Sequence, residues 1–270
     1  MNAVCVARPG HTLRGQVSGE GPPILLLHGL TATRRYVVHG STALDRAGHR
    51  VIALDARGHG ESDPAPASRA YTYADYVADA EAILDATDTP HAVVVGQSMG
   101  AAAAVALTLA SPERVDALVL ITPAHLGKPS ANLARWDALA DGLERGGPAG
   151  FLEALGNPSA DDRYNETVRT VIAQRLARHA HPAAVANALR ATPRSVAFAG
   201  VDALAGVTVP TLVIGSRDAA DPDHPLAVAE EWTRQIPNSR LLVEGPDESP
   251  LAWRGGSLSV AILEFLALVV

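Results

Sequence analysis

Several residue types are scarce in this chain, and each scarcity excludes a class of protein. Cys5 is the one cysteine among 270 residues, which excludes an intramolecular disulfide and favours a reducing compartment. Lys and Arg total 22 against 29 Asp and Glu, a formal net charge of -7. With neither a basic patch nor a polybasic run, we expect no nucleic-acid partner and no anionic membrane partner. Aromatic residues are 4% of the chain and the cations are not clustered, which together argue against polyanionic ligands.

Long apolar runs are also missing. No stretch of 18 or more apolar residues occurs, so no membrane-spanning helix is predicted. The N-terminus lacks the basic-then-apolar pattern of a secretory signal. Glu264 interrupts the apolar end of the chain, which we interpret as an amphipathic last helix. From these patterns we expect a cytoplasmic protein.

The residues that are abundant predict an α/β fold. Hydrophobic residues make up 47% of the sequence, and the length suits one α/β domain with or without an insertion. Apolar runs without polar alternation indicate parallel strands whose two faces are both buried by helices. These strands are expected over 23–27, 50–54, 91–96, 115–121, 209–215 and 240–244, and helices over 34–47, 73–86, 99–111, 225–236 and 257–268.

The most informative motif is the pentapeptide 96–100, Gly-Gln-Ser-Met-Gly. It lies between an apolar strand-like run and an Ala-rich helical run, which is the context of a nucleophile elbow. Ser98 would occupy a turn so sharp that only glycines two residues before and after it leave room for the strand and the helix. The N-terminus of the following helix would direct its amide dipoles at a developing anion.

Two further segments fit the same architecture. One strand-like run ends in His28-Gly29-Leu30, and another ends in the segment 55–62, Asp-Ala-Arg-Gly-His-Gly-Glu-Ser. With the elbow, these motifs closely resemble the α/β-hydrolase family in sequence, order and spacing. The resemblance implies a mostly parallel, doubly covered sheet with a helical lid insertion. It also implies that His59 is a scaffold residue.

The resemblance assigns further site residues. The backbone N–H groups of Leu30 and Met99 would form the oxyanion hole. His28, Gly29, Gln97 and Trp136 are candidates for contacts with the substrate. The lid would be residues 124–206, where the strand signal vanishes, and the core would be 1–123 and 207–270. Four breaks separate the lid into short helical pieces: Gly146-Gly147-Pro148, Asn157-Pro158, His181-Pro182 and Thr192-Pro193. Within the lid, we interpret His179 and His181 as residues of a solvated helix face rather than a metal site.

In the family, the acid member of the catalytic triad follows the strand that comes after the lid, here the run predicted over 209–215. Gly215 leads into Asp218, which matches the family's strand-Gly-x-x-Asp position. Asp221 and Asp223 are interpreted as loop and helix-cap residues, because Asp before Pro commonly starts a helix. Asp221 remains an alternative acid.

The sequence departs from the family at the catalytic histidine. In the family this residue lies just past the final strand, but here no histidine follows His224. When the turn that carries the family's histidine is aligned with the turn after the last predicted strand of this chain, Glu248 falls at the position of the base. The implied constellation is therefore Ser98, Asp218 and Glu248.

A carboxylate with an ordinary pKa of about 4.3 is a poor base for a serine hydroxyl. Two carboxylates close together in a covered pocket raise one pKa, so a proton shared by Asp218 and Glu248 could imitate a histidine. Two alternatives remain open. Glu248 could be a charged turn residue paired with an arginine, or a histidine could reach the site from another element; the candidates are His28, His125 and His224.

Three functions are compatible with this sequence. The favoured one is a hydrolase of small carboxylic esters, lactones or thioesters that acts through an acyl-enzyme on Ser98. The alternatives are a lyase or isomerase on the same scaffold and a binding protein without turnover. No cofactor is implied, because the sequence has neither a dinucleotide fingerprint after its first strand nor a Walker motif. The expected partner is a small-molecule substrate, and the oligomeric state is open.

Overall fold

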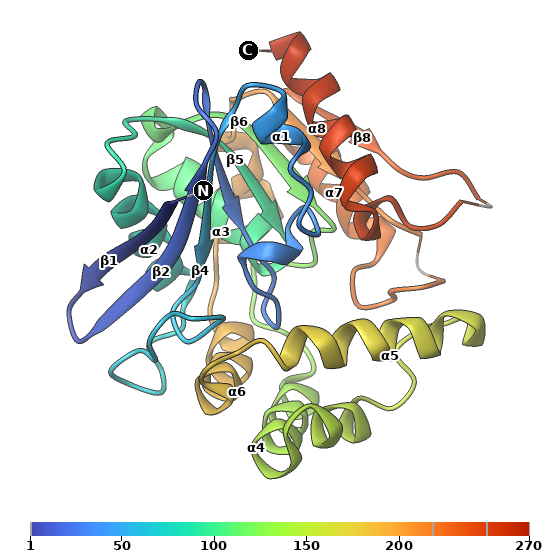
Figure 1. Ribbon diagram of the computed structural model, residues 1–270. Helices are drawn as coiled ribbons and strands as arrows, with labels where there is room; N and C mark the ends of the chain where they lie inside the picture. Colours follow the sequence, from blue (N-terminus) through green and yellow to red (C-terminus); the bar gives the residue numbers. More distant parts are fainter. Residues whose placement is uncertain (1, 218, 247, 270) are drawn as a thin grey trace.

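One eight-stranded sheet organises the molecule (Figure 1). The computed structural model describes residues 2–217, 219–246 and 248–269. The strand order is β1-β2-β4-β3-β5-β6-β7-β8, with β1, β2 and β4 joined antiparallel and all other neighbours parallel. The strands are β1 (Asn2–Arg8), β2 (His11–Ser18), β3 (Pro23–Leu27), β4 (Arg50–Asp55), β5 (Ala92–Gln97), β6 (Val115–Ile121), β7 (Thr211–Ile214) and β8 (Ser239–Leu242).

The six strands predicted from apolar runs are all present, and the doubly covered parallel sheet is confirmed. Along β5, Val94 faces one apolar core while Val93 and Val95 face the other. The N-terminal hairpin of β1 and β2 was not predicted. Its strands are partly solvent-exposed, so they lack the continuous apolar run that marks a strand buried on both faces.

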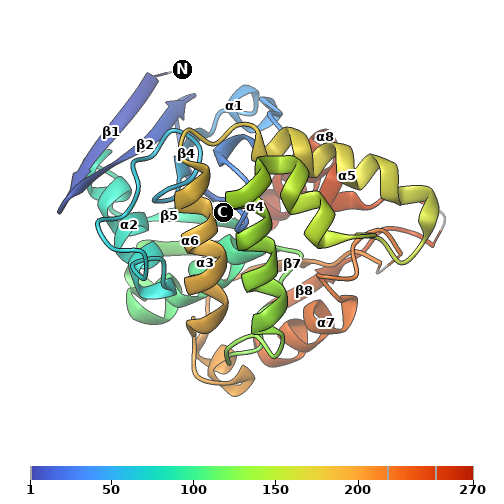
Figure 2. The ribbon, with the colours of Figure 1, turned by 90° about the horizontal axis from the view of Figure 1, so that it is seen from below.

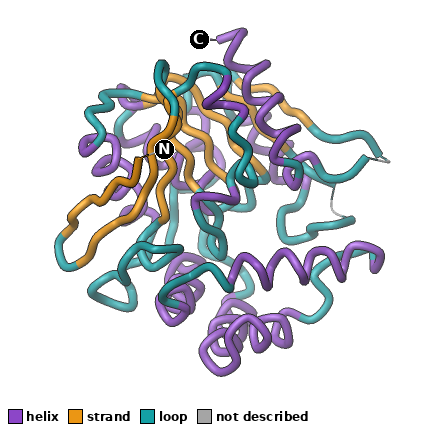
Figure 3. Tube along the Cα trace, viewed as in Figure 1, coloured by secondary structure: helices purple, strands orange, loops and turns teal. Residues whose placement is uncertain are grey.

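Helices cover both faces of the sheet (Figure 3). One face packs against α2 (Tyr73–Ala86), α3 (Met99–Ala110) and α7 (Leu226–Gln235), and the other packs against α1 (Ala43–Arg46) and α8 (Gly255–Val269). A capping box between Thr72 and Asp75 starts α2. Short 3₁₀ turns are η1 (Arg34–Tyr36), η2 (Pro112–Arg114), η3 (Thr192–Arg194), η4 (Val201–Gly206) and η5 (Leu251–Trp253).

The helix predicted over 34–47 is wrong. Only η1 and the four-residue α1 form in that stretch. His39 and Gly40 both have positive φ, 48° and 74°, which a right-handed helix cannot accommodate. This break leaves the chain after the oxyanion turn as an irregular loop.

A helical insertion between β6 and β7 lies across one end of the sheet (Figures 1 and 2). It contains α4 (Leu133–Leu155), α5 (Asp162–Leu176) and α6 (Pro182–Ala191). The predicted break at Gly146-Gly147 is a kink with non-helical backbone angles inside α4. These helices share an apolar core of their own, against which Leu30 of the oxyanion turn also packs. Within the described ranges, none of the helices combines the length and apolar character needed to cross a membrane.

Candidate active site

Ser98 lies at the sharp turn between β5 and α3. Its backbone angles, φ 53° and ψ -112°, fall where residues other than glycine are rarely found. A Cβ on Gly96 would lie 2.2 Å from the Gly100 carbonyl oxygen, and one on Gly100 would lie 2.1 Å from the Leu27 carbonyl oxygen. The strand and the helix therefore approach too closely for any other residue at these two positions. This is the steric arrangement that the pentapeptide predicts.

A histidine contacts the Ser98 hydroxyl. His224 Nε2 lies 2.7 Å from Ser98 Oγ, and His224 Nδ1 lies 2.8 Å from Asp221 Oδ2. Asp221 and His224 belong to one loop, which joins β7 to α7. Because an ionised carboxylate only accepts hydrogen bonds, Nδ1–H donates to Asp221 and leaves Nε2 to accept the proton of the serine hydroxyl. Ser98, His224 and Asp221 thus form a continuous hydrogen-bonded chain.

The pKa values of this pair shift in opposite directions. Burial acts to lower the pKa of His224, but the charge and hydrogen bond of Asp221 outweigh it and raise that pKa above 6.5. Burial acts to raise the pKa of Asp221, but the charge and hydrogen bond of His224, together with the charge of Arg175, hold that pKa below its usual value. Asp221 therefore stays ionised at neutral pH and favours a positive charge on the imidazole.

The predicted oxyanion residues flank Ser98. A Cβ on Gly29 would lie 3.4 Å from Ser98 Cβ, so the turn 28–30 packs directly against the nucleophile. Met99 is the first residue of α3, where the backbone N–H has no intrahelical acceptor. His59 is buried, and its Nε2 lies 2.5 Å from the Leu30 carbonyl oxygen, which fixes this turn. That contact agrees with a scaffold role for His59.

The structure corrects the position inferred for Glu248. Its carboxylate is exposed and accepts a hydrogen bond from the Gly245 N–H at 2.8 Å, within its own turn. A shared proton in a covered pocket requires a desolvated carboxylate, and an exposed one does not meet that condition. The partner of the Ser98 hydroxyl is instead His224, one of the three histidines left open by the sequence. Asp218, predicted as the acid, lies outside the described residues.

The other candidate histidines have structural partners. His28 is buried, with Nδ1 beside the Gly29 carbonyl oxygen and Nε2 accepting from the Ala56 N–H. His125 Nε2 accepts from the Ala197 N–H, and burial lowers its pKa to about 4. His179, expected on a solvated helix face, is buried and accepts a hydrogen bond from the Gly60 N–H at 2.9 Å. It therefore joins the insertion to the core.

Two residues predicted to contact the substrate, Gln97 and Trp136, lie in different parts of the fold. Gln97 ends β5 and is half-buried next to Ser98. Trp136, on α4, packs against the insertion core and donates from Nε1 to Ser130 Oγ at 3.0 Å. This hydrogen bond gives Trp136 a structural function in the insertion, and its contact with a substrate stays a prediction.

The loop of Asp221 and His224 is held from two sides. On the sheet side, the buried Glu244 carboxylate accepts from Ser216 Oγ at 3.0 Å and from the Arg217 N–H at 2.7 Å. On the insertion side, Arg135 of α4 makes two hydrogen bonds to Asp223, at 2.8 and 2.7 Å. Further contacts join the loop to the segment before α5, from Ser159 Oγ to the Ala220 carbonyl and from the Asp161 N–H to the Ala219 carbonyl.

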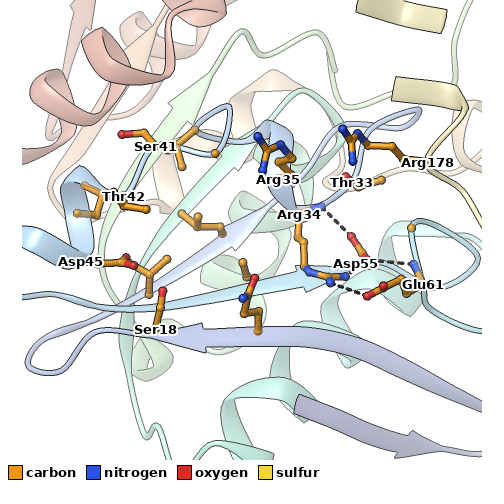
Figure 4. A pocket seen from close by; sticks show the side chains of 18 residues that line it. Ser18, Thr33, Arg34, Arg35, Ser41, Thr42, Asp45, Asp55, Glu61 and Arg178 are labelled. Carbon is orange, nitrogen blue, oxygen red and sulfur yellow. Dashed lines mark hydrogen bonds and ion pairs between the residues drawn. The ribbon is translucent and has the colours of Figure 1, made fainter. Parts of the chain in front are cut away.

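A separate cavity of about 310 Å³ lies beside η1 and α1 (Figure 4). Within it, Arg34 pairs with Asp55 and Glu61, and the Arg34 backbone N–H donates to Asp55 at 2.8 Å. None of its lining residues belongs to the hydrogen-bonded chain of Ser98. Its three arginines, Arg34, Arg35 and Arg178, face three acids, Asp45, Asp55 and Glu61, so its charges balance.

A serine on a strained strand–turn–helix elbow, hydrogen-bonded to a histidine that is in turn bonded to a carboxylate, defines the class of serine-nucleophile α/β proteins. Residues 22–249 match the family model described as the alpha/beta hydrolase fold. The chain therefore belongs to the α/β-hydrolase family.

Individual relatives agree with this assignment. The chain is 36% identical over 208 residues to RutD from Variovorax paradoxus (strain S110), named as a carbamate hydrolase; the match covers 74% of this chain and 75% of that one. It is 30% identical over 238 residues to a 2-hydroxy-6-oxononadienedioate/2-hydroxy-6-oxononatrienedioate hydrolase from Pseudomonas putida, covering 83% and 80%. A thermophilic esterase from Thermogutta terrifontis superposes with a TM-score of 0.78 at 26% identity, covering 100% and 99%.

Sequence reasoning ranked His224 below Glu248 because it relied on the family position after the last strand. One signal pointed to His224: it is a histidine in the same loop as the candidate acids, three residues after Asp221 and two residues before the first residue of α7. Such a short separation allows a local turn to bring the two side chains together, as the hydrogen bond from the His224 N–H to the Asp221 carbonyl confirms.

Proposed function

We propose that this protein hydrolyses small carboxylic esters, lactones or thioesters through an acyl-enzyme on Ser98, with His224 as the base and Asp221 as the acid. The observation that carries the proposal is the 2.7 Å contact between His224 Nε2 and Ser98 Oγ. The relatives named as hydrolases and as an esterase support hydrolysis over the lyase, isomerase and binding alternatives.

The proposed reaction begins when Ser98 Oγ attacks the substrate carbonyl carbon and its proton passes to His224 Nε2. The negative charge that develops on the carbonyl oxygen would be stabilised by the N–H groups of Leu30 and Met99. His224 then gives the proton to the leaving alcohol or thiol, whose bond to the carbonyl carbon breaks. A water molecule then gives a proton to His224 Nε2 and attacks the acyl carbon. The bond between that carbon and Ser98 Oγ breaks, the carboxylic acid leaves, and His224 returns the proton to Ser98 Oγ.

In this proposal both partners of the nucleophile come from the loop after β7. The family histidine after the last strand is not needed, because His224 supplies an imidazole with a raised pKa at the same hydroxyl. The insertion, residues 124–206, would act as the lid that excludes water from the acyl-enzyme.

The test compares two substitutions in one assay. His224→Gln removes the proposed base and should lower kcat/KM for an activated 4-nitrophenyl ester by 100-fold or more, on the order of the loss of a general base. Glu248→Gln is the matched control and should leave kcat/KM within about twofold, because that carboxylate is exposed in its own turn.

Covalent labelling gives the second readout. A fluorophosphonate should add mass to Ser98 in the wild type and fail to do so in Ser98→Ala. If Glu248→Gln loses activity while His224→Gln keeps it, the assignment of the base is wrong. If the wild type neither turns over esters nor is labelled, hydrolysis itself is excluded.

A further inference from the structure

The cavity beside η1 and α1 carries its charges unevenly (Figure 4). Its volume of about 310 Å³ is at the lower end of small-molecule sites. Arg34 is paired with the carboxylates of Asp55 and Glu61, so its charge is already neutralised. Arg35 and Arg178 line the same cavity and form no ion pair within the part of the chain that the structure describes. The charges therefore balance in total, but two guanidiniums remain available to an anion.

The position of Arg35 is determined by the loop that follows η1. The Gly40 N–H donates to the Arg35 carbonyl oxygen at 2.8 Å, and the positive φ of Gly40, 74°, turns the chain back. A Cβ on Gly40 would lie 3.0 Å from Arg35 Cζ and 3.1 and 3.2 Å from its two Nη atoms. The guanidinium therefore lies against the Gly40 backbone, in space that a side chain at this position would enter. Among the described residues, none accepts a hydrogen bond from it.

Arg178 reaches the cavity from the insertion. It follows α5 in the chain, and its Nε donates to the Tyr36 hydroxyl at 3.3 Å, so the last residue of η1 orients this guanidinium. The next residue, His179, accepts a hydrogen bond from the N–H of Gly60, which also lines the cavity. These contacts hold Arg178 at the cavity wall, where its two Nη groups have no acceptor among the residues described.

Two guanidiniums beside one cavity repel each other when no negative group lies between them. Figure 4 shows Arg35 and Arg178 at the upper edge of the cavity, above the cluster of Arg34, Asp55 and Glu61. Each guanidinium presents a planar fork of N–H donors that matches the oxygen atoms of a carboxylate or a phosphate. An oxyanion held by both arginines would therefore reduce the repulsion and accept their hydrogen bonds.

We propose that this cavity binds the oxyanion group, carboxylate or phosphate, of a small hydroxylated molecule between Arg35 and Arg178. The rest of the wall suits hydroxyl groups. Asp45 lines it without an ion pair to any described residue, and Ser18 and Thr42 add hydroxyls of their own. The Asp45 carboxylate can accept hydrogen bonds from ligand hydroxyls, and its charge disfavours a second anionic group there. The cavity shares no residue with the hydrogen-bonded chain of Ser98, so this binding is independent of ester hydrolysis.

Binding at this cavity would also join the insertion to the rest of the fold. Arg35 belongs to the stretch that follows the oxyanion turn, and Arg178 belongs to the insertion. His179 Nε2, beside Arg178, lies 3.1 Å from the Thr31 carbonyl oxygen, so this joint is next to the oxyanion turn. A bound oxyanion should therefore slow amide hydrogen exchange in residues 33–41 and 177–181, because it opposes local opening of both segments.

Isothermal titration calorimetry on the wild type tests the site with five small probes. D-glycerate and glycerol 3-phosphate carry an oxyanion with hydroxyl groups, acetate and inorganic phosphate supply the oxyanion alone, and glycerol supplies the hydroxyls alone. We expect glycerate or glycerol 3-phosphate to bind with a dissociation constant of about 1 mM or lower. Acetate and inorganic phosphate should bind more weakly, and glycerol should not bind. The tighter of the first two probes identifies the oxyanion as a carboxylate or a phosphate.

Variants of the two arginines locate the bound probe. Arg35→Gln and Arg178→Gln should each weaken binding about 10-fold or more, because each removes a charge-assisted hydrogen-bond donor. Arg35→Lys keeps the charge without the fork and should retain part of the affinity. The matched control, Arg46→Gln, removes an exposed arginine of α1 outside the cavity wall and should leave the affinity within about twofold. All three side chains are exposed, so thermal unfolding without a probe should be unchanged.

Equal affinity of the wild type, Arg35→Gln and Arg178→Gln would place the probe elsewhere and overturn the proposal. Glycerol that bound as tightly as glycerate, or no binding of any probe at about 10 mM, would also overturn it. Hydrogen exchange gives a second readout, in which protection of 33–41 and 177–181 should rise with the probe in the wild type and not in Arg178→Gln. Protection confined to the elbow around Ser98 would mean that the probe occupies the candidate active site instead. Neither measurement uses ester turnover, so failure of this proposal and failure of the proposed hydrolysis are distinguishable.

Discussion

Ser98 depends on two neighbours for its chemistry. Its backbone has a positive φ, which forms a sharp turn between β5 and α3. Gly96 and Gly100 have no side chains, so the strand and the helix can pack closely enough for this turn to form. His224 then provides an imidazole nitrogen at 2.7 Å, oriented by the hydrogen bond to Asp221. A carboxylate in the same place would need a large rise in pKa to accept the serine proton, whereas an imidazole needs none.

The raised pKa of His224 predicts the pH dependence. His224 accepts the serine proton only when it is neutral, so kcat/KM for a neutral ester should rise with pH through a midpoint above 6.5. In Asp221→Asn the charge that raises this pKa is lost while burial remains, so the midpoint should fall and the rate should drop by about 10²- to 10⁴-fold. A pH–rate profile of each variant measures both effects.

The control for this prediction is Asp223→Asn. Asp223 also raises the pKa of His224, by a weaker effect than that of Asp221, so its removal should move the midpoint down by less. By linkage, protonated His224 stabilises the fold below about pH 6.5, and this contribution is lost as the pH rises through the higher folded-state pKa. A wild-type midpoint below 6.5 would contradict the pairing of His224 with Asp221.

The loop between β7 and α7 is the element on which the candidate site depends. It carries both Asp221 and His224, so one backbone segment determines the position of two side chains. Glu244 holds its beginning against the sheet, and Arg135 holds its end against α4. The insertion therefore orients the histidine as well as covering the end of the sheet.

We predict that Arg135→Gln lowers kcat about 10-fold by loosening this loop, because small displacements of a catalytic group have large effects on rate. Stability should change by less than about 1 kcal/mol, since the ion pair with Asp223 is partly exposed. Arg190→Gln is the matched control: it removes two ion pairs inside the insertion and should leave kcat within about twofold. If both variants lowered kcat equally in steady-state kinetics, the ion pair between Arg135 and Asp223 would not position the loop in the way predicted.

On the scale of the whole molecule, three separate apolar cores stabilise the fold. Two lie on the faces of the sheet and hold the elbow, and the third lies within the insertion and includes Phe151 and Leu143. Leu30 packs against both the first sheet core and the insertion core. The oxyanion turn therefore lies at the junction between the sheet and the insertion.

Because the insertion has its own core, Phe151→Ala should destabilise it locally, by about 3 to 5 kcal/mol. Hydrogen exchange followed by mass spectrometry should show faster exchange in α4, α5 and α6, with β5 still protected. The control, Leu120→Ala, removes a side chain of the sheet core and should speed exchange in the sheet as well. Equal loss of protection in β5 and α4 after Phe151→Ala would mean that the two parts unfold together.

The sequence by itself determined six strands of the sheet, the elbow and the oxyanion turn. Each is encoded locally, by apolar runs of strand length or by glycines at fixed positions around Ser98, and local steric rules are sufficient to interpret them. The hairpin of β1 and β2 and the break after η1 escaped prediction. Half-exposed strands lack a continuous apolar run. The positive φ at His39 could not be foreseen, because in a sequence such a conformation is usually indicated by a glycine.

Only the tertiary structure decided which side chains meet Ser98. Ser98 and His224 are far apart in the chain, and their contact depends on the loop conformation held by Glu244 and Arg135. The family position after β8 favoured Glu248, but hydrogen bonding depends on distance and direction in space rather than on order along the chain.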